Sequence, residues 1–264
     1  MPTLTDIAAA IEEYAPLSGQ ESWDNSGWQL VPRGKDISCT GVMLCLDVTP
    51  DVVSEAHSAG CNLIVSHHPL IFKGVRSIAD GASQQQDAII SAIGQGISVY
   101  SSHTALDCAP GGPSAWLAQN LDFDITIDSP LDPDTGLGIV GSLAIPCSPD
   151  ELITAVLNLY GGGIRTTAGR TTSIRRIAIC SGSGGEFIPR AIAIGADAYI
   201  TSDIRYHDFL DHGKSIILVD TGHFESEICT KSIFSRIISE KFPNFAVRMC
   251  QCEHAPVAYH VKKS

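Results

Sequence analysis

The chain has 264 residues, of which 44% are hydrophobic and 17% charged, and its formal net charge is −12. This composition excludes a disordered chain and supplies enough apolar side chains for one large or two ordinary domains. The acidic balance argues against nonspecific binding to nucleic acid or to acidic membranes, and no apolar run approaches the roughly 18 residues of a membrane span.

The expected secondary structure alternates strands with helices. The first half predicts a helix over Thr5 to Tyr14, capped by Thr5 or Asp6, and then a strand over Gly41 to Asp47. A helix over Val52 to Ala59, ended by Gly60, and a strand over Leu63 to Ser66 follow. The last two predicted elements of this half are a helix over Gln84 to Gln95 and a strand over Ile97 to Ser101. Such alternation indicates parallel strands in a layered α/β domain, which binds ligands beyond the carboxyl ends of its strands.

The second half repeats the first with a shift of 135 residues and no gap. The strand Val42 to Cys45 then falls on Ile177 to Cys180, and Gly60 falls on Gly195. His67 and His68 fall on Ser202 and Asp203, so the histidine pair belongs to the first copy alone. We interpret this as a duplicated scaffold, whose copies are separated by the Asp-, Pro- and Thr-rich stretch from Asp128 to Gly138. The predicted domains are residues 1–127, residues 128–220 and a C-terminal segment over 221–264 that returns to the first domain.

Histidines follow three of the expected strands. His67 and His68 end the apolar run before Pro69, while His103 follows one strand and His223 follows another. His103 and His223 each have a carboxylate four residues on, Asp107 and Glu227, which is one helical turn and therefore the same face. Imidazole with carboxylate is the ligand set of Zn, Mn or Fe(II) sites, so these segments predict a metal site rather than chance clustering.

Two other segments leave alternatives open. The basic stretch Gly161 to Arg176, with Arg165 and Arg170, is either a solvated hairpin or a loop that binds phosphate through arginine forks and glycine amides. Cys250, Cys252 and His254 alternate along an expected strand, where they form either a soft-metal site or, more commonly, buried structural cysteines. The nine scattered cysteines and the absence of a signal-peptide pattern favour reduced thiols and a cytoplasmic location.

Five ordered motifs resemble the Nif-three-like family, whose members are commonly named GTP cyclohydrolase 1 type 2 homologues. They are Trp23-Asp24-Asn25-Ser26-Gly27, Ser66-His67-His68-Pro69, His103-Thr104-x-x-Asp107, Asp203-x-Arg205-Tyr206-His207-Asp208 and Gly222-His223-x-x-Ser226-Glu227. Ala105 departs from the asparagine of many members, but it is not a ligand position. The resemblance covers nearly the whole chain.

The resemblance implies two similar α/β domains with a dinuclear metal site in the cleft between them, in a toroidal homohexamer. Carried over by motif position, the ligands of two divalent ions (Zn, Mn or Fe) are His67, His68, Asp107, His223 and Glu227, with Glu227 as the bridging carboxylate. His103 is then expected to face the substrate or to support a ligand.

The expected function is a metal-dependent hydrolase in which two ions activate a water that attacks a nucleotide such as GTP. His103 and His207 are the candidates for proton transfer. The same ion pair would equally suit cleavage of a phosphate ester. The alternative is a protein without catalysis that binds or delivers metal, or regulates a partner, through the same residues.

Overall fold

The computed structural model describes residues 1–161, 163–167, 169 and 171–260, and these form two compact units. Unit 1 comprises Met1–Ala109 and Thr230–His254, and unit 2 comprises Pro110–Cys229 with the chain from Ala255 onward. The second unit therefore begins earlier than the predicted Asp128, and the return to unit 1 comes later than residue 221. The reason is that the helix α5 (Pro113–Asn120) packs its apolar side chains into the core of unit 2.

Unit 1 is built on a five-stranded sheet in the order β1-β4-β3-β2-β11. The central strands are short, apolar and buried on both faces, as expected for parallel strands covered by helices. Strands β2, β3, β4 and β11 are parallel, whereas β1 is an antiparallel edge. The strands are β1 (Gly27–Leu30), β2 (Val42–Cys45), β3 (Leu63–Ser66), β4 (Ser98–Ser101) and β11 (Val247–Met249).

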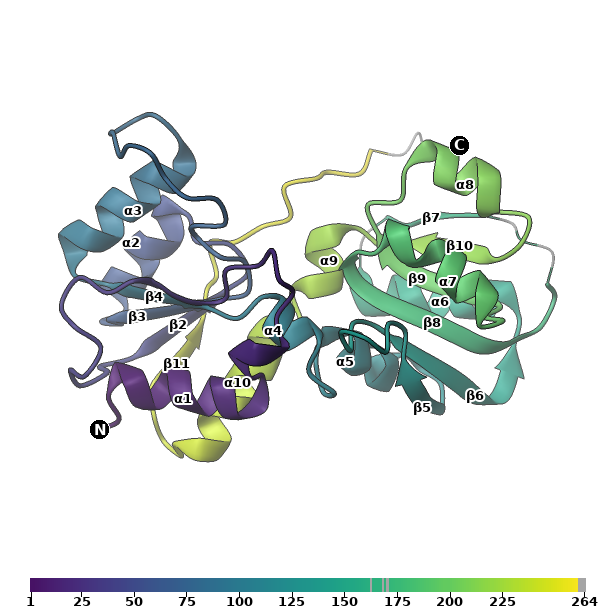
Figure 1. Cartoon of the computed structure of the whole chain (residues 1–264), viewed down its shortest axis with the longest axis horizontal. Helices are drawn as coiled ribbons and strands as arrows, with labels where there is room; N and C mark the ends of the chain where they lie inside the picture. The colour runs from purple at the N-terminus through teal and green to yellow at the C-terminus, as the bar shows by residue number, and fades with distance from the viewer. Residues whose placement is uncertain (162, 168, 170, 261–264) are drawn as a thin grey trace. The chain divides into compact units, whose positions relative to one another are not determined.

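Helices cover both faces of this sheet (Figure 1): α2 and α3 lie on one face, and α1 and α10 on the other. The helices of unit 1 are α1 (Leu4–Tyr14), α2 (Pro50–Ser58), α3 (Gln84–Gln95), α4 (Thr104–Asp107) and α10 (Thr230–Lys241), with a 3-10 turn over Leu17–Gly19. The predicted cap of α1 was wrong. Thr3 is the cap, because its hydroxyl and the Asp6 carboxylate exchange hydrogen bonds with each other's backbone N–H groups.

Unit 2 is built on a mixed sheet in the order β5-β6-β8-β9-β10-β7. Strands β8, β9 and β10 are parallel, and β5, β6 and β7 join as antiparallel strands. The strands are β5 (Ile125–Pro130), β6 (Ile139–Cys147), β7 (Arg165–Thr166), β8 (Ile174–Ser183), β9 (Ala198–Ser202) and β10 (Ile217–Asp220). Residues 128–138, expected as a linker, instead end β5 and turn into β6.

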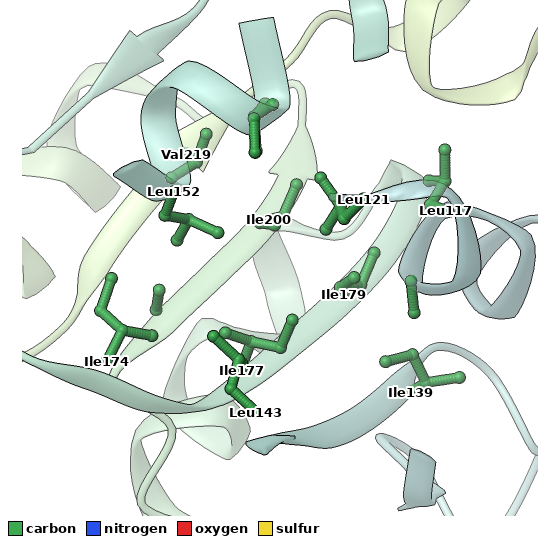
Figure 2. Close-up of a cluster of buried hydrophobic side chains, with 14 of the residues drawn as sticks. Leu117, Leu121, Ile139, Leu143, Leu152, Ile174, Ile177, Ile179, Ile200 and Val219 are labelled. Atoms are coloured by element: carbon green, nitrogen blue, oxygen red, sulfur yellow. The ribbon is translucent and has the colours of Figure 1, made fainter. Parts of the chain in front are cut away.

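The helices of unit 2 are α5, α6 (Pro149–Tyr160), α7 (Ile188–Ala193), α8 (Tyr206–His212) and α9 (His223–Glu227), with a 3-10 turn over Gly185–Phe187. One face of the sheet packs against α5 and α6 through a cluster that includes Leu117, Leu152, Ile177, Ile179 and Ile200 (Figure 2). The other face packs against α7 and Phe209 of α8. Two buried faces explain why the central strands are apolar throughout.

The predicted duplication appears in the register of the strands. Val42 of β2 pairs with Leu63 of β3, and Ile177 of β8 pairs with Ala198 of β9. Both members of the second pair lie 135 residues beyond those of the first. The two units therefore share one β–α–β core, and their differences lie in the strands added at the edges. Across the described residues, no helix is both long and apolar enough to cross a membrane.

Candidate metal centre

The first group of site residues lies at the carboxyl end of β3 in unit 1. β3 is buried along its whole length, and the backbone N–H groups of His67 and His68 donate to the carbonyls of Cys45, the last residue of β2, and of Leu46, the residue after it. The two histidines are thus held by the edge of the sheet rather than by a loose loop. His67 is completely buried, and His68 is partly exposed.

Each of these imidazoles is oriented by an oxygen atom. His67 Nδ1 lies 3.0 Å from the carbonyl oxygen of Ser102, and His68 Nδ1 lies 2.8 Å from Asp47 Oδ1. A carbonyl or carboxylate oxygen can only accept, so Nδ1 carries the proton in both rings. Nε2 is then the nitrogen that offers a lone pair, which is the tautomer found in metal-ligating histidines that donate to a carboxylate or carbonyl.

His103 follows β4 and is held in the same way. Its Nδ1 lies 2.8 Å from Asp24 Oδ1. The other carboxylate oxygen of Asp24 accepts from the backbone N–H and hydroxyl of Thr104, at 3.0 and 2.6 Å. Burial alone would raise the pKa of Asp24, but the hydrogen bonds from His103 and Thr104 lower it well below its usual range. Asp24 is therefore a carboxylate near neutral pH and fixes the ring of His103.

The structure brings three of the predicted histidines together. His67, His68 and His103 each have a ligand nitrogen within 4.8 Å of the others, and their ring centroids are 5.2 to 5.5 Å apart. Asp107 closes the group from α4, because its Oδ1 lies 3.5 Å from His67 Nε2. His103 was expected to face the substrate or to support a ligand, and in the structure its ring lies directly beside His67 and His68.

The second group lies in unit 2, after β10. His223 and Glu227 occupy the first and last positions of α9, and His223 Nε2 lies 2.9 Å from Glu227 Oε2. His223 Nδ1 lies 2.7 Å from Asp203 Oδ2. Burial alone would lower the pKa of His223, but the hydrogen bonds and charges of Glu227 and Asp203 outweigh it and raise the pKa to about 9. Asp203 adopts a left-handed backbone conformation, with φ of 56°, as it turns out of β9.

The position of Glu227 depends on a glycine. Gly182 has φ of +68°, and a Cβ atom added to it would collide with Glu227 Oε1. The backbone N–H of Gly182 also donates to the hydroxyl of Ser226, at 2.9 Å. Glu227 is 3% exposed, so its carboxylate fills the space that a side chain at position 182 would take.

A pocket of about 310 Å³ opens beside His223 within unit 2. It is lined by Arg165, Asp203, Asp220, Gly222, His223, Phe224, Glu225, Pro256, Val257 and Tyr259. Arg165 is already engaged there, because its guanidinium pairs with Asp220 and donates to the carbonyl oxygen of Ile204 at 2.9 Å. Of the basic stretch proposed to bind phosphate, Arg165 therefore reaches the pocket, while Arg170 lies outside the described residues.

The remaining predicted residues are not members of these two groups. His207 is exposed on α8, where its ring contacts Tyr206 at 5.3 Å between centroids, and it does not line the pocket beside His223. The expected strand over Cys250 to His254 was wrong, since β11 ends at Met249 and a bend follows.

Sequence reasoning missed the orienting roles of Asp47 and Asp203. Both residues follow strands of the duplicated core, and Asp203 is the residue that aligns with His68 when the chain is shifted by 135 residues. An acidic residue directly after a strand was therefore the sequence feature that could have indicated these roles. Asp24 was visible in the Trp23–Gly27 motif, but its partner His103 is far away in the sequence.

Comparison with known proteins places these residues in a family. The family model described as Duf34/NIF3 (NGG1p interacting factor 3) matches residues 2–256. A protein of Clostridium perfringens named GTP cyclohydrolase 1 type 2 homolog is 37% identical over 231 residues, which cover 85% of this chain and 86% of that protein. A protein of the same name from Lactococcus lactis is 32% identical over 251 residues and covers 92% of each chain.

Solved structures show the same fold. The Staphylococcus aureus protein SA1388 matches with a TM-score of 0.87 and 27% identity, over 98% of this chain and 100% of that one. A Bacillus cereus protein related to NIF3 matches with a TM-score of 0.84 at 19% identity, over 98% of this chain and 99% of that one, and this likeness speaks for the fold alone. The family match over nearly the whole chain and the identity to curated relatives lead to one conclusion: the chain belongs to the Duf34/NIF3 family.

Proposed function

We propose that this protein is a hydrolase that uses two divalent metal ions held by His67, His68, Asp107, His223 and Glu227. The observation that carries the proposal is the common orientation of the histidines. In His67, His68 and His223 an oxygen of the protein faces Nδ1, which leaves Nε2 as the nitrogen that would bind metal. The Nε2 atoms of His67 and His223 already lie beside the proposed carboxylate ligands Asp107 and Glu227. Nitrogen and carboxylate donors without sulfur suit Zn, Mn or Fe(II).

The proposal requires ligands from both units to hold the same pair of ions. The proposal therefore predicts the metal content of two variants. Asp107→Ala and Glu227→Ala should each lower the content of both ions, because the ligands of one unit are not sufficient without those of the other. His212→Ala, at the partly exposed last residue of α8, is the matched control and should keep both ions. Elemental analysis of the folded variants decides the point, and retention of both ions by Glu227→Ala would overturn the bridging role of Glu227.

Bound ions would lower the pKa of a coordinated water and supply hydroxide near neutral pH. His103 is suited to move the accompanying proton, because Asp24 fixes its Nδ1 and leaves Nε2 on the side of His67 and His68. Replacing His103 should lower the rate by about two to four orders of magnitude while metal remains bound. His207 is the second candidate for proton transfer, and His207→Ala with intact metal content tests that role separately.

The surface beside His103 favours a substrate with a planar ring. Trp23 and Phe72 are 58% and 42% exposed, and their ring centroids lie 6.0 and 6.1 Å from that of His103. Large aromatic side chains left open beside a polar centre provide a face on which a base can stack. This accords with a nucleotide substrate, for which the names of the curated relatives suggest GTP.

The deciding experiment incubates the metal-loaded protein with GTP and measures formate and phosphate separately. Formate identifies opening of the guanine ring, and phosphate without formate identifies ester cleavage. Trp23→Ala should raise the KM with little effect on kcat if the base stacks on Trp23. If a protein that holds both ions forms neither product, the hydrolase proposal is overturned in favour of metal binding or delivery.

The family resemblance also leads us to propose a homohexamer. Light scattering tests this directly, and a stable monomer at micromolar concentration would contradict it.

A further inference from the structure

We propose that Glu55, Cys250 and Cys252 form a second metal site, which binds a thiophilic divalent cation such as Zn²⁺. The three residues lie in unit 1. Glu55 is on α2, and the two cysteines are on the bend that follows β11. None of them belongs to the histidine groups described above.

The three ligand atoms already converge. Cys250 Sγ lies 3.3 Å from Cys252 Sγ and 3.1 Å from Glu55 Oε2, and the three lie within 4.8 Å of one another. Tetrahedral Zn²⁺ with Zn–S bonds of about 2.3 Å separates its two sulfur ligands by about 3.8 Å. The two sulfurs need therefore spread by only about 0.5 Å to admit the ion. Cys252 is exposed, so it has room to move and leaves the fourth position to water.

Backbone hydrogen bonds hold the arrangement in place. The N–H of Cys250 donates to the carbonyl oxygen of Leu44 at 2.9 Å, which fixes this residue beside β2. The N–H groups of Gln251 and Cys252 both donate to the carboxylate of Glu55 at 2.9 Å. The carboxylate is thus anchored between the two cysteines before any ion binds, which lowers the entropic cost of binding.

Binding of the divalent cation to the two cysteines releases their thiol protons. A thiol is ordinarily protonated near neutral pH, so Cys250 and Cys252 each carry a proton to release. Each thiol loses its proton to solvent as a metal–sulfur bond forms. The buried ammonium of Lys231 lies 3.0 Å from the carbonyl oxygen of Cys250 and 3.0 Å from Glu253 Oε2, so the Lys231–Glu253 ion pair also holds the backbone of Cys250 in place.

The sulfur ligands allow metal binding at this site to be distinguished by absorption spectroscopy from metal binding at the proposed dinuclear centre. Co²⁺ bound by thiolates gives an intense near-ultraviolet charge-transfer band, which nitrogen and oxygen ligands do not give. Titration of the reduced, chelator-treated full-length protein with Co²⁺ should therefore produce this band, and Zn²⁺ should abolish it. Glu227→Ala should leave the band unchanged, so the proposal stands or fails independently of the hydrolase proposal.

Three variants complete the test. Cys252→Ser replaces an exposed side chain and should remove the band while the far-ultraviolet circular dichroism stays unchanged. Glu55→Gln keeps an acceptor for the two N–H groups, and the removal of its charge should weaken Co²⁺ binding at least tenfold. Cys61→Ser, in the same apolar cluster but away from the site, is the control and should keep the band. Absence of the band from the reduced wild-type protein, or its persistence in Cys252→Ser, would overturn the proposal.

Discussion

Gly182→Ala should damage the candidate metal centre, although glycine has no side chain that could bind metal. An alanine there meets two separate obstacles. The left-handed backbone at φ of +68° costs a residue with a Cβ about 1–2 kcal/mol. The added Cβ also collides with Glu227 Oε1, so the carboxylate must move away from His223 Nε2, from which it now lies 2.9 Å.

The cost of that displacement follows from burial. Glu227 is 3% exposed, and a hydrogen bond to a charged group contributes about 1.5–3 kcal/mol. The two effects together predict that Gly182→Ala lowers the free energy of unfolding by about 2.5–5 kcal/mol in the metal-free protein. We also expect the variant to retain less metal, because Glu227 is a proposed ligand.

Gly195→Ala is the matched control. Gly195 has φ of +74°, but nothing lies within 4 Å of an added Cβ, so this variant meets the backbone strain alone. It should lose about 1–2 kcal/mol and keep its full metal content. The assay is urea unfolding of the chelator-treated proteins, together with elemental analysis of the reloaded ones. Equal destabilisation of the two variants, with both ions retained in Gly182→Ala, would refute the reasoning.

Three further variants test other parts of the structure. Asp24→Asn should lower the rate about 10–100-fold with metal content unchanged, because His103 loses the carboxylate that fixes its ring, and steady-state kinetics would show it. Lys231→Met should lower the free energy of unfolding by about 3–5 kcal/mol, because it leaves the buried carboxylate of Glu253 without its ion pair; Glu253→Gln in the same chain should restore part of the loss. Glu151→Gln should be less stable than the wild type at pH 7 but equal to it in strong acid. Hydrogen bonds from the cap of α6 lower the pKa of Glu151, so its contribution is complete above the unfolded-state pKa and is lost as pH falls through the folded-state pKa. A stability difference that stays constant down to strong acid would contradict this assignment.

Local patterns predicted most of the fold because the strands are short and buried on both faces. The strand Leu63–Ser66 and the helix Gln84–Gln95 are found at their predicted bounds, since a polar or glycine residue ends each apolar pattern. The edges of the sheets were harder to predict. The end of β5, Asp128 to Pro130, belongs to the stretch that the sequence indicates as a linker, and only its pairing with β6 in unit 2 makes it part of a strand. Such long-range pairing is not encoded in a local pattern.

The positions of the site histidines after strand ends could be predicted from the sequence, but the contacts that orient their rings could not. A histidine at a strand end is visible in one sequence, because apolar runs and their end points are local. The acceptors Asp47 and Asp24 lie 21 and 79 residues from His68 and His103. The sequence suggested Asp24 as a partner of a site histidine or as a cap, and only the fold shows which ring each carboxylate contacts. The same limit explains Gly182, whose importance depends on Glu227, a residue of another element.

Duplication accounts for the way the two groups of site residues correspond. β4 pairs in parallel with β3, and β10 pairs in parallel with β9, so α4 and α9 begin at equivalent points of the two units. Each carries a histidine and, four residues on, a carboxylate: His103 with Asp107, and His223 with Glu227. In unit 1 the carboxylate approaches His67, which the second copy lacks, whereas in unit 2 Glu227 approaches its own His223. The same strand–helix junction thus carries two different arrangements of histidine and carboxylate, because the histidine pair after β3 is present in only one copy.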